Sequence, residues 1–383
     1  MSFLTLALIA VVALAGPLLA LPVRWHLPVV LGELLAGVLI GRTGLALVDP
    51  GDPTFSLLAN IGFALMMFVA GTHVPVRDPV IRPALGRGAG RAVLAAAAAA
   101  AAGTGLGLLF GTGHAPLYVV LLASSSAALV LPIVDSLRLG GPQVVAMMAQ
   151  VAIADIACIV ALPLALDPPN AARGALGALA VAAAAVVLFF GLRALERRGT
   201  RQRVHRLSEQ RKFALELRIQ LALLFALAGI ANLGRVSVML AGFSFGLVVA
   251  AVGEPRRLAR QLFAVSDGFL GPVFFVWLGA TLNLRDLAGR PEMVALGLAL
   301  GLGTVALHAG LRAVGLPLPL GVMSAAQLGI PVAAASIGTQ LNVLLPGEDA
   351  ALLLGALVTI GASALAGSRA AGTFGPPPGA DTR

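Results

Sequence analysis

The chain has 383 residues, of which 59% are hydrophobic and only 11% are charged, and its mean hydropathy is +0.97. Because a soluble domain carries roughly 25% charged residues, this composition excludes a soluble globular protein and favours a polytopic helical membrane protein. Lys and Arg number 26 against 17 Asp and Glu. These basic residues lie in short segments between apolar runs, so they indicate membrane orientation and not nucleic-acid binding.

Apolar runs bounded by charged residues, Pro and Gly predict about thirteen transmembrane helices. In chain order they are 3–21, 27–41, 55–74, 90–112, 116–136, 143–166, 172–192, 213–233, 236–253, 262–282, 293–312, 317–341 and 350–368. No basic segment precedes the first run, which we interpret as a span and not as a signal peptide.

The distribution of arginines predicts that the N-terminus lies outside and the C-terminus inside. In this orientation the basic clusters Arg77–Arg91, Arg193–Lys212 and Arg256–Arg260 all fall on the cytoplasmic side. The segment 193–212 divides the chain into two halves. We interpret it as a linker that sets topology, with lipid-headgroup recognition as the alternative. The Pro/Gly-rich residues 371–383 are predicted to form a disordered tail.

Two predicted spans contain helix-breaking residues near their middles. Span 116–136 has Ser124–Ser126 ahead of Pro132, and span 317–341 has Gln327 ahead of Pro331. Proline removes a backbone donor, and inside a membrane the freed carbonyls need hydroxyls, an amide or a cation as partners. Interrupted spans in corresponding places of two halves indicate the ion site of a secondary transporter. Ordinary proline kinks are the alternative.

Asp155 stands alone in the uncharged run 144–166, with Arg138 and Asp167 as its nearest ionisable neighbours in sequence. A charge at mid-membrane costs from ~2.5 to more than 10 kcal/mol. Such a carboxyl therefore faces a cavity, a partner or a transported ion. Glu33 lies near the middle of span 27–41, and both a structural role in a dimer panel and a role in an ion pathway remain open for it.

Five stretches resemble signatures of the monovalent cation:proton antiporters, in the branch with bacterial sodium/proton and potassium-efflux antiporters. They include the second-span stretch PVVLGELLAGVLIGRTGL and the third-span stretch IGFALMMFVAGTHV. SSSAALVLPIVDSL resembles the unwound span, ADIACIVAL the proton-carrying span, and GFLGPVFFVWLGATLNL a late signature. These stretches occur in family order over nearly all of residues 1–370.

The resemblance implies an all-α inverted-repeat fold in which two broken helices cross, with one transmembrane domain over residues 1–370. Residues 1–85 and 213–285 would form a dimerising panel, residues 86–168 and 290–370 a moving core, and 169–212 a linker. The implied movement of the core against the panel is elevator-like, in a homodimer in a bacterial cell membrane.

Site residues also follow from the resemblance. The essential aspartate of the family matches Asp155, and its unwound-span hydroxyl motif matches Ser125 and Ser126. Three positions depart from the family pattern. Ala154 replaces a residue that is usually acidic or an amide, Gln327 replaces an acid, and Gly303 replaces a lysine, for which His308 is the nearest candidate substitute.

The implied function is exchange of protons for Na⁺ or K⁺, serving ion transport and pH homeostasis, with Asp155 as the shared proton and cation site. The oxygens of Ser125, Ser126 and freed carbonyls suit such hard cations. A single carboxylate without the lysine predicts electroneutral exchange. We expect no cofactor, no transition metal and no enzymatic activity. A channel-like cation conduit and a non-transporting membrane sensor are the alternatives, and the sequence leaves the choice among Na⁺, K⁺ and Li⁺ open.

Overall fold

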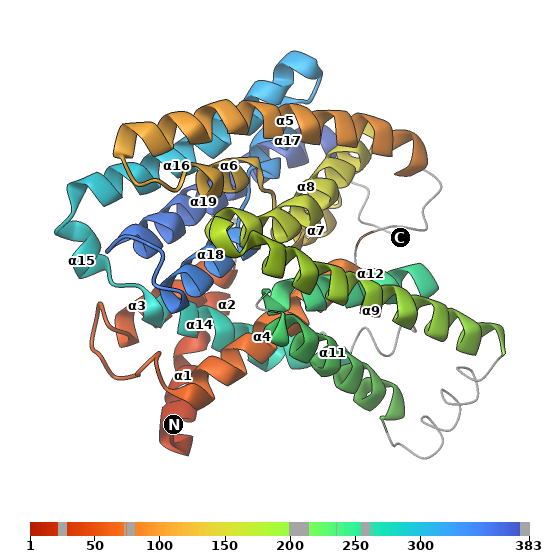
Figure 1. Cartoon of the computed structure of the whole chain (residues 1–383), viewed down its shortest axis with the longest axis horizontal. Coiled ribbons are helices and arrows are strands. Elements are labelled where there is room, and N and C mark those ends of the chain that lie inside the picture. Colours follow the sequence, from red (N-terminus) through yellow and green to blue (C-terminus); the bar gives the residue numbers. More distant parts are fainter. Residues whose placement is uncertain are drawn as a thin grey trace. The chain divides into compact units, whose positions relative to one another are not determined.

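The computed structural model describes residues 1–21, 29–72, 74, 81–198, 214–234, 236–253, 261–262 and 264–375. These residues form α-helices joined by short turns, with no β-strand among them, which confirms the predicted all-α class (Figure 1). Within the described ranges, nine helical segments are long and apolar enough to cross a membrane, and three shorter apolar helices accompany them. Each predicted span overlaps a helix or a pair of helices, while the predicted orientation remains a prediction.

The chain divides into two compact units. Unit 1 consists of Met1–Ala15, Glu33–Arg77 and Asn170–Thr281, and unit 2 of Gly16–Gly32, Asp78–Pro169 and Leu282–Arg383. Two helices, α2 (Ala15–Ala20) and α3 (Val29–Ile40), run across a boundary between these segments.

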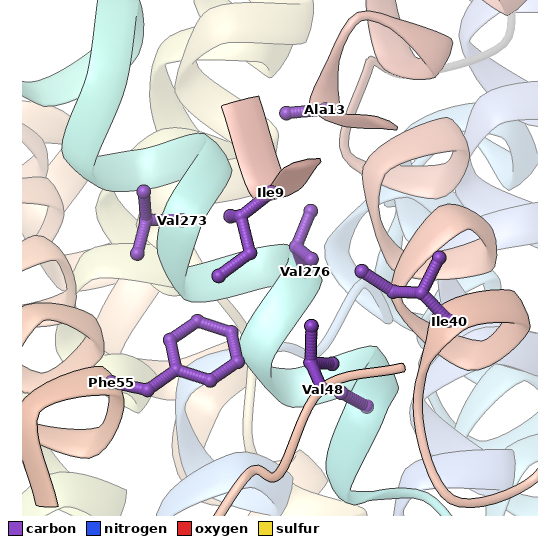
Figure 2. Packing of buried hydrophobic residues seen from close by; sticks show 8 residues of the cluster. Ile9, Ala13, Ile40, Val48, Phe55, Val273 and Val276 are labelled. Carbon is purple, nitrogen blue, oxygen red and sulfur yellow. The ribbon is translucent and has the colours of Figure 1, made fainter. Parts of the chain in front are cut away.

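The other helical elements of unit 1 are α1 (Phe3–Ala13), α4 (Pro53–Thr72), α9 (Ala171–Arg197), α11 (Leu215–Leu233), α12 (Val238–Val252), the π-helical turn η3 (Ser266–Leu270) and α14 (Gly271–Thr281). Figure 2 shows how side chains from α1, α3, α4 and α14 converge, with Ile9, Phe55 and Val276 among the labelled residues. All three are at most 1% exposed. This core is apolar.

Glycines bring the helices of unit 1 close together. A Cβ at Gly242 of α12 would lie 2.3 Å from the carbonyl oxygen of Ala64 in α4. A Cβ at Gly279 of α14 would lie 2.1 Å from the carbonyl oxygen of Leu34 in α3. Only glycine, which has no side chain, permits two helix backbones to approach this closely. These helix pairs of unit 1 therefore pack with their backbones in direct contact, as is common in membranes.

Unit 2 contains α5 (Ile81–Phe110), α6 (Ala115–Ala123), α7 (Ala127–Ser136), α8 (Pro142–Leu166), α15 (Leu284–Ala288), α16 (Pro291–Gly310), the 3-10 turn η4 (Leu311–Val314), α17 (Leu318–Ser324), α18 (Gly329–Gln340) and α19 (Glu348–Phe374). The short 3-10 turn η2 (Pro168–Asn170) lies across the boundary between Pro169 of unit 2 and Asn170 of unit 1. In Figure 1, α5 lies along α6 and α8, and α16 lies along α19. The two interrupted spans are thus enclosed by long continuous helices of the same unit.

The structure refines the predicted interruptions. Span 116–136 is split into α6 and α7 at Ser124–Ser126, and span 317–341 is split into α17 and α18 just after Ser324. Pro132 lies inside α7, whereas Pro331 lies in the first turn of α18, where no intrahelical donor is required. Each break therefore precedes its proline.

Two other predicted boundaries change. The helix α19 continues through Phe374, four residues into the predicted tail, because the first proline after its start is Pro376. Residues 376–383 and most of the basic linker, 199–213, lie outside the described residues.

Candidate functional site

Asp155 lies in the middle of α8 and is 3% exposed. Its Oδ2 accepts a hydrogen bond of 2.9 Å from the backbone N–H of Ala127, the first residue of α7. The amino end of a helix carries N–H groups without intrahelical acceptors and a partial positive charge. The break before α7 thus creates the donor that the carboxylate of Asp155 accepts.

The two interrupted helices meet at their breaks. The N–H of Ser126 donates to the carbonyl oxygen of Ala326 over 2.8 Å, although the two residues are far apart in sequence. Ser126 is buried, and its side chain makes no capping hydrogen bond to α7. This backbone contact joins the segment after α6 to the segment after α17.

The carbonyl groups at the end of α17 receive hydroxyl donors. Ser125 Oγ donates to the carbonyl oxygen of Ser324 over 2.7 Å. Ser363 Oγ, from α19, donates to that of Met323 over 3.3 Å. Ser125, predicted as a cation ligand, therefore also caps the opposite broken helix.

The carbonyl groups at the end of α6 receive an amide. Gln327 Nε2 donates to the carbonyl oxygen of Leu121, and lies 3.3 Å from that of Ser124 and 3.5 Å from Thr304 Oγ1. The backbone N–H of Gln327 donates to Thr359 Oγ1. Ser125, from the first break, thus caps the end of α17, and Gln327, from the second break, caps the end of α6.

A second cluster of polar side chains surrounds Ser324. Its Oγ donates to the carbonyl oxygen of Gly321, accepts from Gln150 Nε2 at 3.4 Å, and lies 3.2 Å from Nδ1 of His308. Gln150 and His308 are both fully buried, and the backbone of Leu122 also interacts with the imidazole. His308, the candidate substitute for the missing lysine, therefore lies beside the end of α17.

The remaining predicted residues are placed as follows. Ala154 is buried in α8. A Cβ at Gly303 would lie 3.4 Å from Leu122 Cδ2, so this position of α16 faces the last turns of α6. Glu33 belongs to unit 1, where it is buried and Asp267 of the π-helical turn acts on it electrostatically.

Sequence reasoning did not single out Gln150, Thr304, Ser324, Thr359 or Ser363. Each is a polar residue that is at most 1% exposed in an apolar helix of unit 2. Gln150 had a signal in the sequence, because it is the polar residue nearest to Asp155 within the same uncharged run. The serines and threonines had none, since single hydroxyls are common in transmembrane helices.

The chemistry of this crossing is that of hard oxygen donors around one carboxylate. Among the described residues, no group of three or more His, Cys, Asp or Glu side chains could hold a metal ion. Membrane-length helices, two of them interrupted and crossing beside a buried carboxyl, define the class of secondary membrane transporters.

Comparison with known proteins gives the family. The profile of the sodium/hydrogen exchanger transmembrane family matches residues 7–368, and the chain therefore belongs to that family. The expected resemblance is confirmed, and membership of a transporter family agrees with the expectation that the chain is not an enzyme.

Three similar proteins illustrate the relationship. YjbQ of Bacillus subtilis, named for Na⁺/H⁺ antiport, is 25% identical over 381 residues, which cover 93% of this chain and 61% of that protein. The glutathione-regulated potassium-efflux protein KefC of Salmonella typhi is 29% identical, with coverages of 79% and 49%. The chain thus spans less than two thirds of either relative. The sodium proton antiporter NhaP1 of Methanocaldococcus jannaschii shares the fold, with a TM-score of 0.65 and 17% identity over 97% of this chain and 99% of that one.

Proposed function

We propose that this chain exchanges protons for a monovalent cation, Na⁺ or K⁺, across a membrane, with Asp155 as the site that the two share. The observation that carries the proposal is the burial of a lone carboxyl at the crossing of two broken helices, where its Oδ2 accepts from the N–H of Ala127. Family membership and the activities named for the relatives support the same reaction.

Competition at one carboxylate is sufficient for coupling. Low dielectric disfavours the ionised carboxylate, so the site is stabilised either by a proton or by a dehydrated cation. In both states it is neutral. The empty and charged state is opposed by its desolvation cost, which prevents return without a bound ion. Exchange is then obligatory.

The cation would be held by oxygen atoms around Asp155. A hydroxyl has one donor and two lone pairs, so Ser125 can donate to the carbonyl of Ser324 and still present a lone pair to a cation. Ser126 Oγ would add a second hydroxyl. The carbonyls of Leu121 and Ser124 are occupied by the Gln327 amide, so we do not assign them as cation ligands.

The proposed movement is elevator-like. Unit 2, which contains Asp155 and both interrupted helices, would be the moving core, and unit 1 would be the panel that forms a homodimer. The long apolar helices and the bacterial relatives support a bacterial cell membrane as its location.

The exchange would be electroneutral. At the crossing, the positions occupied by Gln327 and Gly303 carry no charge, and Asp155 is the carboxyl that binds either ion. One positive charge would then move in each direction. Electroneutral exchange would thus depend on the residues at positions 327 and 303, since an acid or a lysine there would add a second charge to the transport cycle.

The decisive experiment is Asp155→Asn in everted membrane vesicles. Proton movement is recorded after addition of Na⁺, K⁺ or Li⁺ at several pH values, and Asp135→Asn in the exposed part of α7 is the matched control. We expect Asp155→Asn to reduce the signal to that of vesicles without the protein, while Asp135→Asn retains it. Equal signals from wild type and Asp155→Asn would refute the proposal.

A separate measurement tests electroneutrality. Proteoliposomes are given a cation gradient at defined membrane potentials, and an electroneutral exchanger responds equally to each potential. A voltage-dependent exchange current would exclude one-for-one exchange, and conductance beyond the turnover of a carrier would indicate a channel.

A further inference from the structure

A buried arginine joins three segments of unit 2 away from the crossing of the broken helices. Arg91 of α5 is 6% exposed. Its Nη2 donates to Oε1 of Gln143, in the first turn of α8, over 3.2 Å and to the carbonyl oxygen of Gly315, just after η4, over 3.0 Å. No described residue accepts from Nη1, although this atom is buried as well. One half of the guanidinium thus holds two neighbouring segments, and the other half has no partner.

The described part of the chain does not neutralise the charge of Arg91. Both of its acceptors are neutral groups, and none of the described carboxylates forms an ion pair with it. Instead, Arg87, one turn earlier on α5, acts on it with a second positive charge. Removal of a charge from water is costly unless an opposite charge compensates it. The surroundings of Arg91 therefore favour the binding of an anion at this end of unit 2.

Two exposed arginines adjoin this contact. Arg87 lies four residues before Arg91, so the two share one face of α5, and Arg312 lies in η4, three residues before Gly315. The helix α5 contacts η4, and the hydrogen bond from Arg91 to the carbonyl of Gly315 joins residues that are 224 positions apart. Arg87, Arg91 and Arg312 therefore form one positively charged surface, which we call the arginine patch.

Exposed apolar side chains continue from the arginine patch. Leu94 lies on the face of α5 that carries Arg87 and Arg91, and Val314 of η4 and Leu318 of α17 lie on the neighbouring segment. All three apolar side chains are exposed. In a membrane, such side chains contact acyl chains, whereas arginines near helix ends reach the headgroups. A molecule with an anionic head and apolar chains matches both parts of this surface.

We propose that the arginine patch binds the phosphate group of an anionic phospholipid. The planar guanidinium groups of Arg87 and Arg312 form paired hydrogen bonds with phosphate oxygens. Arg91 positions η4 through the carbonyl of Gly315 and adds its uncompensated charge, and Leu94 contacts an acyl chain. The predicted orientation places the patch at the cytoplasmic leaflet, whose surface is rich in anionic headgroups.

A role in membrane topology alone does not account for Arg91. Arginines that set orientation need only lie near the cytoplasmic end of a span, and Arg87 and Arg312 meet this condition. Arg91 is instead buried and donates to two other segments of unit 2. Topology requires neither property, whereas an anion site uses the positive charge that these contacts hold in place.

Lipid binding by the purified full chain in a nonionic detergent tests the proposal. Native mass spectrometry measures the binding of added phosphatidylglycerol, and zwitterionic phosphatidylcholine is the comparison lipid. We expect wild type to prefer phosphatidylglycerol. The double variant Arg87→Gln with Arg312→Gln changes two exposed side chains and should bind this lipid about thirtyfold more weakly, because each arginine near an anionic headgroup contributes about fivefold.

Arg173→Gln with Arg290→Gln is the matched control. It removes two exposed arginines from the predicted extracytoplasmic side and should bind phosphatidylglycerol as wild type does. Equal weakening in the two double variants, or equal binding of the two lipids by wild type, would overturn the site. Inorganic phosphate at the concentration of the lipid should leave the lipid bound. Displacement by phosphate would show a free-anion site and refute the lipid proposal.

The contribution of Arg91 is measured in the same assay. Arg91→Gln removes the buried charge, and we expect about fivefold weaker binding of phosphatidylglycerol. Binding equal to wild type would remove Arg91 from the patch. If Arg91→Gln does not fold, the double variant with Arg87 and Arg312 replaced decides on the site. None of these measurements depends on ion exchange, so their outcome is separate from that of the proposed function.

Discussion

Helices of both units approach closely at glycines, but unit 2 also buries a network of polar side chains between its helices. In unit 1, Gly242 and Gly279 lie directly against the carbonyl groups of neighbouring helices, and Phe63 stacks on Phe274 with ring centroids 4.7 Å apart. In unit 2, Asp155 and Gln327 are buried with partners from other helices. Close apolar packing stabilises a fixed arrangement, whereas buried polar groups provide chemistry. The two units should therefore respond differently to substitution.

The largest effect is expected for Gly242→Leu in unit 1. The Cβ of the new side chain would lie 2.3 Å from the carbonyl oxygen of Ala64. Such a clash with the backbone destabilises the folded protein by about 3 kcal/mol or more. We expect loss of monodisperse protein in size-exclusion chromatography. Gly229→Ala in α11, where a Cβ would meet nothing within 4 Å, is the control and should preserve the yield. Equal yields for both variants would contradict a glycine-dependent scaffold.

Substitution of Gln327 should lower exchange without preventing folding. Gln327→Ala removes the amide donor from the carbonyls of Leu121 and Ser124, and that of Leu121 keeps the hydroxyl of Ser124 as a donor. Loss of the donor to the buried carbonyl of Ser124 costs about 1–3 kcal/mol, or roughly tenfold or more in exchange rate. Gln327→Glu places a carboxylate against the same oxygens, so it must bind a proton or a cation. We expect the exchange current in proteoliposomes to depend on voltage for Gln327→Glu alone. Unchanged exchange in both variants would show that this cap has no part in transport.

A smaller effect is expected for Ser125→Ala. The variant loses the donor to the carbonyl of Ser324 and one proposed cation ligand, so the half-saturating cation concentration should rise about tenfold, as for loss of one hydrogen bond to a charged group. Ser125→Thr keeps the hydroxyl and should restore affinity. Ser136→Ala in the exposed end of α7, whose hydroxyl bonds only the local carbonyl of Ile133, should have no effect. Equal affinities for Ser125→Ala and Ser136→Ala would remove Ser125 from the site.

Much of the fold follows from the sequence, because a membrane requires every backbone polar group to be paired within a helix. Apolar run length therefore predicts where helices lie, and the predicted spans overlap the observed ones. The predicted breaks at 116–136 and 317–341 are also present. The chain leaves the helix at Ser124–Ser126 and after Ser324, the polar stretches that precede the two prolines in the sequence, and each proline follows in the next helix.

The partners within the site could not be predicted in the same way. Ser125 and Ser324 are 199 residues apart, and Arg91 is 224 residues from Gly315. Hydropathy identifies a polar residue in an apolar helix but does not identify which distant helix presents its partner. Gln327 illustrates the limit: the sequence marked its position, and the structure supplied the two carbonyl groups that it caps.

The reciprocal capping of the two breaks also constrains how the protein is made. Leu121 and Ser124 enter the membrane about 200 residues before Gln327, the amide that caps them, has been synthesised. At about 5–20 residues per second this interval lasts about 10–40 s. During biosynthesis the carbonyl of Leu121 can already accept from Ser124, but the carbonyl of Ser124 lacks the Gln327 amide until the second half is made. The first half of the chain therefore cannot complete its own folding. The ribosome has to deliver the second half before the first becomes native.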